Sequence, residues 1–289
     1  MTPTLKAALW MTGAIASFSG MAVAGRELGA MHDTFEIMFY RSLVGIVVVS
    51  LVLTATRKWS QVSTRALGTH AIRNTVHFAG QNLWLYAVTA IPLAQVFALE
   101  FTQPLWVILL SPLLLGERLT PVRVLSALIG FAGILIVARP GATEIGPGVV
   151  AAGASAMFFA LTTIATKRLT RIASVGCIMF WITTMQAVLG LAAAGIDGAI
   201  ALPTAQSVPW LVLVGLAGLL AHFCIASALS IAPATVVIPI DFVRLPAIAV
   251  IGMLLYHEPL DIWVLLGAAV IFAGNYLNIL AETRKFRVA

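Results

Sequence analysis

Charge is scarce in this sequence. Only 10% of its 289 residues are Asp, Glu, Lys or Arg, whereas 61% are hydrophobic. A soluble globular domain carries about 25% charged residues, so a soluble fold of this composition would expose large apolar patches and aggregate. The shortage of charge excludes a soluble enzyme, a nucleic-acid-binding module and a disordered chain. The net charge of +6 does not argue for a nucleic-acid partner, because the basic residues lie in short loops between apolar runs.

Cysteine is equally scarce. The two cysteines, Cys177 and Cys224, both lie in apolar runs, so no disulfide framework is predicted. The sequence also lacks an Asn-x-Ser/Thr glycosylation acceptor. It contains no Cys, His and carboxylate cluster with the spacing of metal ligands. We therefore predict neither a metal site nor a cofactor.

Long apolar runs, by contrast, are abundant. A hydrocarbon core about 30 Å thick needs about 20 apolar residues per helix. Ten runs meet this length, at about residues 5–25, 34–54, 70–89, 92–113, 121–138, 147–166, 174–195, 207–229, 233–255 and 260–280. Every connection between them is short. The sequence predicts an all-α, polytopic membrane protein with ten transmembrane helices and no soluble domain.

The basic residues predict which way the chain faces. Most of the 17 Lys and Arg residues fall in one set of loops and ends: Lys6, Arg57, Lys58, Arg65, Arg118, Arg123, Lys167, Arg168, Arg171, Arg284, Lys285 and Arg287. The opposite set of loops holds only Arg26 and Arg139. Because cytoplasmic loops carry an excess of Lys and Arg, we predict cytoplasmic N- and C-termini. The short loops and this bias fit a bacterial inner membrane.

The chain also repeats itself at an offset of 141 residues. The stretch LLLGERL, which begins at Leu113, aligns with LLYHEPL from Leu254. Further aligned pairs are Pro92 and Pro233, Glu100 and Asp241, Phe101 and Phe242, and Gly133 and Gly274. Each half holds five spans, an odd number, so the second half must cross the membrane in the opposite direction. We predict two inverted five-helix repeats, residues 1–140 and 141–289, with a substrate site near the midplane between them.

A family resemblance follows from these features. Ten short spans in two repeats, with Pro104, LLLGERLT and GFAGILIV closing the first half, resemble the EamA family of the drug/metabolite transporter superfamily. The second half departs from the motif, with Tyr256-His257-Glu258-Pro259 in place of Gly-Glu-Arg. The resemblance covers nearly the whole chain and implies transport of a small metabolite such as an amino acid, riboflavin or S-adenosylmethionine. It does not select the cargo or the direction of transport.

Ionisable residues inside the predicted spans point to the site. Each costs roughly 2.5–3.5 kcal/mol at a helix centre, so such residues are functional candidates. They are Arg41, Arg73, Glu100, Asp241 and Arg244. Glu100 and Asp241 lie about eight residues into their spans, near mid-depth at 1.5 Å per residue.

The repeat converts these residues into matched pairs. Gln81 aligns with His222, Glu100 with Asp241, and Gln103 with Arg244, while Arg73 and His77 share a helical stripe with Gln81. The predicted substrate-binding set is therefore Arg73, His77, Gln81, Glu100, Gln103, His222, Asp241 and Arg244. Trp84, Phe97, Phe101 and Phe242 lie within reach by helix spacing. Glu100 and Asp241 are the predicted proton-coupling residues, with Glu100 favoured because it has no opposite charge within a turn of its own helix.

Proline adds to this site. Pro104 and Pro246 lack an N–H group, so the carbonyls of Glu100 and Phe242 lose their helical partners. Such breaks are tolerated in a membrane where the backbone lines a cavity.

Structural alternatives remain open at several positions. One alternative is that Asp241 and Arg244 form an ion pair that only holds two helices together. Another alternative is that Glu100 pairs with Arg41, Arg73 or Arg244. Arg73 alternatively snorkels to the interface, and His77 and His222 are packing residues. Outside the site, we predict helix-end or loop contacts for Glu117 and Glu258, and interhelical hydrogen bonds for Asn275 and Asn278. Small-residue rows such as Ser126/Gly130 and Gly267/Ala269/Ala273 are helix-packing surfaces or a dimer interface.

These features favour a secondary transporter that moves a small polar metabolite by alternating access, with proton coupling. Opposite charges beside aromatic rings suit a zwitterion or a planar heteroaromatic compound, with Arg244 holding its carboxylate or phosphate. An uncoupled facilitator or channel is the main alternative. We predict no enzymatic activity, because no nucleophile-and-base motif is present. We predict no ATP-driven pumping unless a partner supplies the nucleotide domain, because this sequence contains none. The expected partners are a small-molecule substrate and membrane lipid, with a monomer or a homodimer as the assembly.

Overall fold

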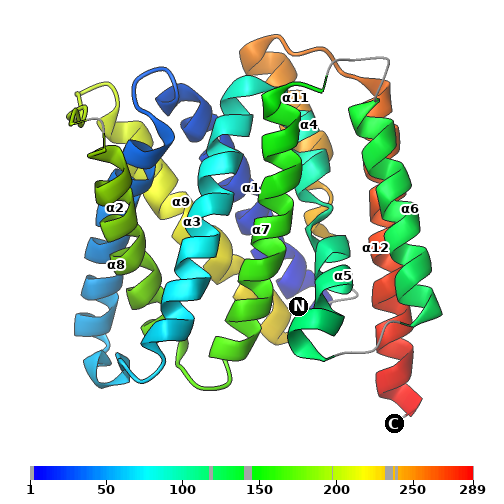
Figure 1. Cartoon of the computed structure of the whole chain (residues 1–289), viewed down its shortest axis with the longest axis horizontal. Coiled ribbons are helices and arrows are strands. Elements are labelled where there is room, and N and C mark those ends of the chain that lie inside the picture. Colours follow the sequence, from blue (N-terminus) through cyan, green and yellow to red (C-terminus); the bar gives the residue numbers. More distant parts are fainter. Residues whose placement is uncertain are drawn as a thin grey trace.

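The helices of the computed structural model run roughly side by side along one bundle axis (Figure 1). The structure describes residues 3–116, 120–139, 145–196, 198–231, 237 and 240–288, and no strand occurs among them. The helices are α1 (Pro3–Leu28), α2 (Thr34–Ala55), α3 (Leu67–Ala90), α4 (Leu93–Glu100), α5 (Gln103–Leu115), α6 (Pro121–Ala138), α7 (Pro147–Leu169), α8 (Val175–Ala194), α9 (Val208–Ile231), α11 (Arg244–Tyr256) and α12 (Ile262–Val288), with a 3₁₀ turn η1 at Trp59–Gln61. The all-α class is confirmed.

Local sequence signals set several helix starts. Asp33 precedes α2, and its Oδ1 accepts hydrogen bonds from the backbone N–H groups of Phe35 (2.7 Å) and Glu36 (2.8 Å). Glu36 returns the interaction, because its Oε2 accepts from the Asp33 N–H at 3.2 Å. This capping box satisfies donors that the helix itself leaves free. Pro121 and Pro147 occupy the first position of α6 and α7, where the missing N–H costs nothing.

Within the described residues, eight helical segments are long and apolar enough to cross a membrane: Leu5–Leu28, Thr34–Ala55, Leu93–Leu110, Pro121–Ala138, Pro147–Leu169, Val175–Ala194, Val208–Ile225 and Ile262–Leu280. A polytopic membrane protein is therefore confirmed. Helix α3 corresponds to the third predicted run but is more polar. The ninth predicted run, 233–255, is represented by the 13-residue helix α11, and residues 232–236, 238 and 239 lie outside the described part. Ten spans therefore stay a prediction.

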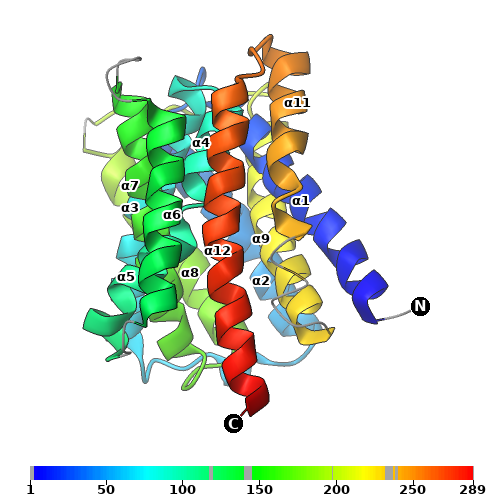
Figure 2. The same cartoon turned by 90° about the vertical axis from the view of Figure 1, so that its right-hand side faces the viewer.

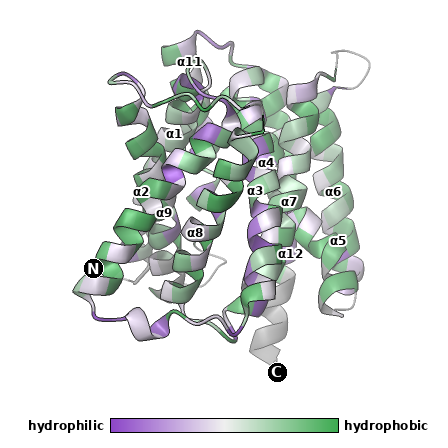
Figure 3. Cartoon of the chain, turned by 60° about the vertical axis from the view of Figure 1, so that its left-hand side comes forward, coloured by the Kyte–Doolittle hydropathy of each residue, from purple (hydrophilic) through white to green (hydrophobic). Residues whose placement is uncertain are grey.

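Many polar side chains of α3 are buried inside the bundle. Its buried residues include His70, Arg73, Asn74, His77 and Gln81. Large apolar side chains lie instead on the outside of the bundle, and Leu51, Leu128, Leu135, Val188 and Leu254 are all more than half exposed. Figure 3 shows hydrophobic colouring along much of the helices, with hydrophilic residues among them. This inside-out distribution fits a bundle surrounded by lipid, in which polar groups must find partners inside.

Two helix breaks occur at matched positions. Helix α4 ends at Glu100, residues 101 and 102 form a turn, and α5 starts at Gln103. In the second half Asp241 is helical, residues 242 and 243 form a turn, and α11 starts at Arg244. The breaks predicted from Pro104 and Pro246 are confirmed.

The two breaks lie against each other. The rings of Phe101 and Phe242 stack with centroids 4.4 Å apart and planes 18° apart. Asn275 of α12 donates a hydrogen bond from Nδ2 to the Phe101 carbonyl at 2.9 Å, which satisfies a carbonyl at the break and confirms its predicted interhelical role. The tertiary structure thus brings both irregular segments together in the bundle interior, where a membrane protein tolerates them.

Four helix pairs pack most closely: α1 with α9, α3 with α7, α2 with α8, and α6 with α12. Figures 1 and 2 both place α6 and α12 side by side at one edge of the bundle. Glycine permits this contact. A Cβ atom added to Gly133 would lie 2.7 Å from the Gly267 carbonyl oxygen, and one added to Gly267 would lie 2.8 Å from the Gly133 oxygen. The small-residue rows therefore form a packing surface within the chain.

Gly133→Ala is expected to destabilise the protein, because the new methyl group has to push the backbones of α6 and α12 apart. Overpacking of this kind costs typically about 1–3 kcal/mol. The measurement is the thermal unfolding midpoint of the purified protein in detergent. Gly20→Ala is the matched control, since a Cβ at Gly20 meets no atom within 4 Å. Equal midpoints for the two variants would show that the close approach does not constrain the helix pair.

Candidate functional site

A cavity of about 500 Å³ lies inside the bundle. Its walls come from α1, α2, α3, α7, α8 and α9, and residues at the α4–α5 break close one side. The polar residues on its walls are Arg41, Ser42, Arg73, His77, Gln81, Glu100, Gln103, Thr162, Thr163, Thr166, Thr183, Gln186 and His222. Phe18, Met21, Trp84 and Phe159 supply much of the apolar lining. Its volume falls within the range of about 300–1,000 Å³ typical of small-molecule sites.

Helix α3 contributes one wall of this cavity. Arg73, His77, Gln81 and Trp84 follow one another at helical spacing and all line it. Arg73 donates a hydrogen bond from Nε to Thr166 Oγ1 (3.1 Å) and from its NH1 group to Asn74 Oδ1 (2.9 Å). Its side chain is therefore held inside the bundle, and the structure does not support the snorkelling alternative.

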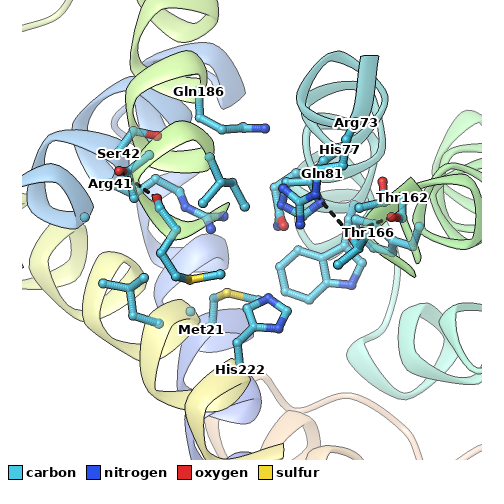
Figure 4. Close-up of a pocket in the computed structure, with 18 of the residues that line it drawn as sticks. Met21, Arg41, Ser42, Arg73, His77, Gln81, Thr162, Thr166, Gln186 and His222 are labelled. Atoms are coloured by element: carbon cyan, nitrogen blue, oxygen red, sulfur yellow. Dashed lines mark hydrogen bonds between the residues drawn. The ribbon is translucent and has the colours of Figure 1, made fainter. Parts of the chain in front are cut away.

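Arg41 of α2 faces α3 across the cavity, and His222 of α9 occupies a third side (Figure 4). The NH1 group of Arg41 donates a weak hydrogen bond to Met38 Sδ at 3.7 Å. Within the described part of the chain, neither Arg41 nor Arg73 lies within ion-pair distance of a carboxylate. The cavity thus holds two guanidinium groups that lack an acidic counterion there.

Several polar atoms around the cavity are also unsatisfied. His77 Nδ1, Gln81 Nε2 and Gln186 Oε1 are buried and have no hydrogen-bond partner in the described structure. The His77 ring packs 5.9 Å from that of Phe159, and the His222 ring lies edge-on to Phe18 at 5.8 Å. Because buried polar groups in native proteins are nearly always paired, unpaired groups on a cavity wall indicate that a ligand or water completes them.

Beside the cavity, three charged residues form a cluster that we call the Glu100 triad: Glu100, Asp241 and Arg244. The NH2 group of Arg244 lies 3.3 Å from Glu100 Oε1 and 3.1 Å from Asp241 Oδ2. Trp84 donates a hydrogen bond from Nε1 to Glu100 Oε2 at 2.7 Å. Glu100 lines the cavity, whereas Asp241 and Arg244 lie behind it and are not part of the lining.

Aromatic rings surround the cation of the triad. The Arg244 guanidinium carbon lies 4.6 Å from the ring centre of Phe18, 5.0 Å from Phe97 and 4.9 Å from Phe101. Such cation–π contacts stabilise a cation removed from water. Asp241 Oδ1 and Arg244 Nε are buried and lack partners among the described residues. With both acids ionised, the triad carries one net negative charge in a buried place.

The structure brings six of the eight predicted site residues to the cavity wall, with Asp241 and Arg244 directly behind Glu100. Gln103 contributes by donating from Nε2 to Thr163 Oγ1 at 2.8 Å. Thr162, Thr163 and Thr166 of α7 also line the cavity but were not predicted, because Thr is common in membrane helices and carries no charge. Arg41 was predicted as an ionisable residue inside a span but not as a site residue.

A second cluster, which we call the Arg26–Glu258 latch, joins loops at the end of the bundle opposite the two chain termini (Figure 2). The Arg26 guanidinium at the end of α1 pairs with Glu258 and donates to the carbonyls of Val88 and Ile91. Glu258 Oε2 accepts from the Leu93 N–H at 2.9 Å. The predicted loop-contact role of Glu258 is confirmed, while Glu117 lies outside the described residues.

The latch has a second layer. Tyr256 Oη donates to Glu27 Oε1 at 2.9 Å, and the Arg26 guanidinium lies 4.8 Å from the centre of the Tyr256 ring. These contacts tie α1 and the connection between α3 and α4 to the end of α11. Phe18 and Met21 of α1 and Trp84 of α3 line the cavity, so the latch joins ends of helices that also form the cavity wall.

Glu258→Ala is expected to loosen the latch, because it leaves Arg26 and the Leu93 N–H without their carboxylate. A cysteine placed in the cavity by Met21→Cys, in a Cys177→Ala/Cys224→Ala background, would report the change through its rate of labelling by a membrane-impermeant maleimide applied from the latch side. A loss of about 1.4 kcal/mol of closure energy corresponds to about tenfold faster labelling. Asp261→Ala is the control, since it breaks the Arg139–Asp261 pair without touching α1. Unchanged labelling in Glu258→Ala would contradict a closing role.

Comparisons with known proteins support a transport fold. Residues 5–139 and 146–280 each match the model of the EamA-like transporter family. The chain is 30% identical over 271 residues to a riboflavin transporter of Brucella anthropi, covering 92% of this chain and 95% of that protein. It is 24% identical to an S-adenosylmethionine uptake transporter of Rickettsia bellii, covering 95% and 94%. A crystal structure matches with a TM-score of 0.63 at 20% identity, covering 96% of this chain and 98% of the other.

Proposed function

The chain belongs to the EamA-like transporter family, and from this premise we propose that it is a secondary active transporter that moves a small polar metabolite across the membrane by alternating access. The observation that carries the proposal is the cavity of about 500 Å³, which gathers charged and polar groups inside an otherwise apolar bundle. Its relatives are named as transporters of riboflavin and of S-adenosylmethionine, which supports a small-metabolite cargo.

We further propose ten spanning helices in two inverted repeats, residues 1–140 and 141–289. The family model matches once on either side of this boundary. The breaks at Glu100 and Asp241 share one register at the offset of 141 residues. Helix packing has the same symmetry. In the proposed repeat, α7 is the counterpart of α1 and α9 is the counterpart of α3, so the α1–α9 contact is equivalent to the α7–α3 contact. The pairs α2–α8 and α6–α12 each join a helix to its own counterpart.

The proposed location is a bacterial inner membrane, with both termini in the cytoplasm. The uneven distribution of Lys and Arg between the two sets of loops supports this orientation, and the relatives compared above come from bacteria. In this orientation the Arg26–Glu258 latch lies on the outer side. Alternating access then requires the latch to open when the cavity faces outward.

Proton coupling through the Glu100 triad completes the proposal. Two carboxylates share a single guanidinium group at 3.3 and 3.1 Å. The excess negative charge is costly away from water, and one proton bound by either acid neutralises it. Glu100 is the acid that lines the cavity, so a proton on Glu100 can exchange with the cavity while Asp241 keeps its contact with Arg244. The competing function is an uncoupled facilitator, which would transport at a rate indifferent to pH.

The proposal is tested by reconstituting the purified protein in liposomes loaded with a mixed metabolite pool. Mass spectrometry then identifies compounds that cross the membrane with and without an imposed pH gradient. A small set of compounds is expected to cross, with the direction of net movement set by the gradient. Protein-free liposomes provide the background. Crossing that ignores the gradient would favour the facilitator, and no protein-dependent crossing would overturn the transport function.

A further inference from the structure

We infer that Arg41 and Arg73 together form a binding site for the carboxylate or phosphate group of a small organic acid. The cavity's role as a cargo site rests on the proposed transport function, whereas binding of an acid by these two arginines does not. The inference narrows the cargo by its charge and assigns Arg41 a role that sequence analysis did not give it.

The charged groups that line the cavity are the first support for this anion site. Among the described residues that line it, Arg41 and Arg73 are the cations of fixed charge and Glu100 is the only acid. Glu100 is already engaged, because one oxygen pairs with Arg244 and the other accepts from Trp84. The two cavity arginines therefore lack a counterion within the described part of the chain. Since an unpaired charge is expensive away from water, an anionic ligand would be stabilised between them.

The hydrogen-bond donors of Arg41 and Arg73 are the second support for this anion site. A guanidinium group offers five N–H donors in a planar fork that matches carboxylate and phosphate oxygens. Arg73 donates hydrogen bonds to Thr166 and Asn74 from Nε and NH1, and Arg41 donates from NH1 to the weak acceptor Met38 Sδ. Donors on both groups thus remain for a ligand. Figure 4 shows Arg41 on one side of the cavity and Arg73 on the other, and both line it, so the proposed acid group would lie between α2 and α3.

The rest of the wall determines what the acid group is attached to. His77 Nδ1 and Gln81 Nε2 are buried without partners beside Arg73, and His222 lies across from them (Figure 4). Trp84 and Phe159 supply flat apolar surfaces on the same cavity. This combination suits an acid that carries a ring with polar edges. A cation would be repelled by Arg41 and Arg73, and an uncharged compound would leave both of them uncompensated.

Arg244 is not the anion site in this arrangement. The sequence suggested that Arg244 holds the cargo carboxylate, but its guanidinium is shared by Glu100 and Asp241 and does not line the cavity. The geometry therefore moves the anion to Arg41 and Arg73 and leaves the triad free to exchange a proton. An amino acid fits the site only through its carboxylate.

Matched ligand pairs test the inference through the thermal unfolding midpoint of the purified full-length protein in detergent. The panel pairs pyridine-3-carboxylate with pyridine-3-carboxamide, adenosine monophosphate with adenosine, and riboflavin 5′-phosphate with riboflavin. In at least one pair the acid is expected to raise the midpoint in a saturable way while its uncharged partner does not. Arg41→Gln and Arg73→Gln are each expected to weaken that binding by about tenfold or more, the size of a lost charge-assisted hydrogen bond.

Two control variants separate binding from folding. Arg41→Lys keeps the charge and is expected to retain most of the binding, and Lys58→Gln removes a cation from an exposed loop and is expected to retain all of it. The inference is overturned if no acid stabilises the protein more than its uncharged partner, or if Arg41→Gln and Lys58→Gln bind equally well. Acid binding without transport in liposomes would keep the inference and overturn the proposed function. Transport restricted to uncharged or cationic compounds would keep the proposed function and overturn the assignment of an acidic cargo.

Discussion

Glu100→Gln is expected to abolish transport driven by a pH gradient while leaving the exchange of cargo for cargo intact. Among the described residues, the substitution removes the one acid that lines the cavity, but it keeps an oxygen that can accept the hydrogen bond from Trp84 Nε1. Arg244 retains Asp241, at 3.1 Å, as its counterion. The triad becomes neutral without a proton, so the cargo cycle no longer has a proton to move. Exchange needs only the alternation of the loaded cavity, which the amide permits.

The measurement compares two modes in the same liposomes: net uptake of an identified cargo under an imposed pH gradient, and exchange of labelled for unlabelled cargo without a gradient. Net uptake is expected to fall to the background of protein-free liposomes, whereas exchange stays within about twofold of wild type, a change of less than 1 kcal/mol. Asp261→Asn provides the same acid-to-amide change at a residue paired with Arg139 outside the cavity, and both modes should survive it. Equal loss of both modes in Glu100→Gln would make Glu100 a cargo-binding or positioning residue, and full retention of both would favour the facilitator.

Arg244→Leu is expected to produce the largest loss of stability, about 3–5 kcal/mol, the cost of removing one partner from a buried ion pair. Both Glu100 and Asp241 depend on the same NH2 group. The rings of Phe18, Phe97 and Phe101 also lose the cation that they surround. Two carboxylates would then face each other in the bundle interior without a counterion. The free energy of unfolding in mixed detergent micelles measures the effect.

Rescue distinguishes electrostatics from lost packing. Adding Glu100→Gln and Asp241→Asn to Arg244→Leu removes both uncompensated charges, and we expect more than half of the lost stability to return. Arg171→Leu removes an arginine from an exposed loop and should change stability by less than about 0.5 kcal/mol, as most surface substitutions do. If the triple variant is no more stable than Arg244→Leu alone, the side-chain volume of Arg244 is what matters and the triad is not an electrostatic unit.

The helical class and the positions of the two breaks were predictable from local sequence. Apolar length determines which segments cross a membrane. A proline removes a specific N–H group, so the loss of helical hydrogen bonds near Glu100 and Asp241 is predictable from Pro104 and Pro246. The offset of 141 residues also predicted that Glu100 and Asp241 occupy equivalent places. Each of these predictions uses the residues of a single segment, or compares one segment with the equivalent segment of the other repeat.

Contacts between segments were harder to predict from the sequence. Sequence spacing placed Arg244 near Asp241, but three separate arginines were equally good partners for Glu100, and only packing of α4 against α11 selects Arg244. The Arg26–Glu258 latch joins residues far apart in the chain, partly through the backbone carbonyls of Val88 and Ile91 at the end of α3, and a carbonyl carries no sequence signal. The cavity-lining role of the α7 threonines was not predictable for a similar reason. Only the packing of α3 against α7 turns them toward the cavity.

The sequence by itself determined that this chain is a helical membrane protein with interrupted helices, because hydropathy and proline chemistry act through the chain's own neighbouring residues. It also marked which buried ionisable groups require partners, because their cost in a membrane does not depend on the fold. The tertiary structure alone decided how those groups are divided. It assigns Arg244 to two acids and leaves Arg41 and Arg73 across a cavity from each other. That division depends on distances between helices, and electrostatic partnership is set by distance and surroundings rather than by residue type.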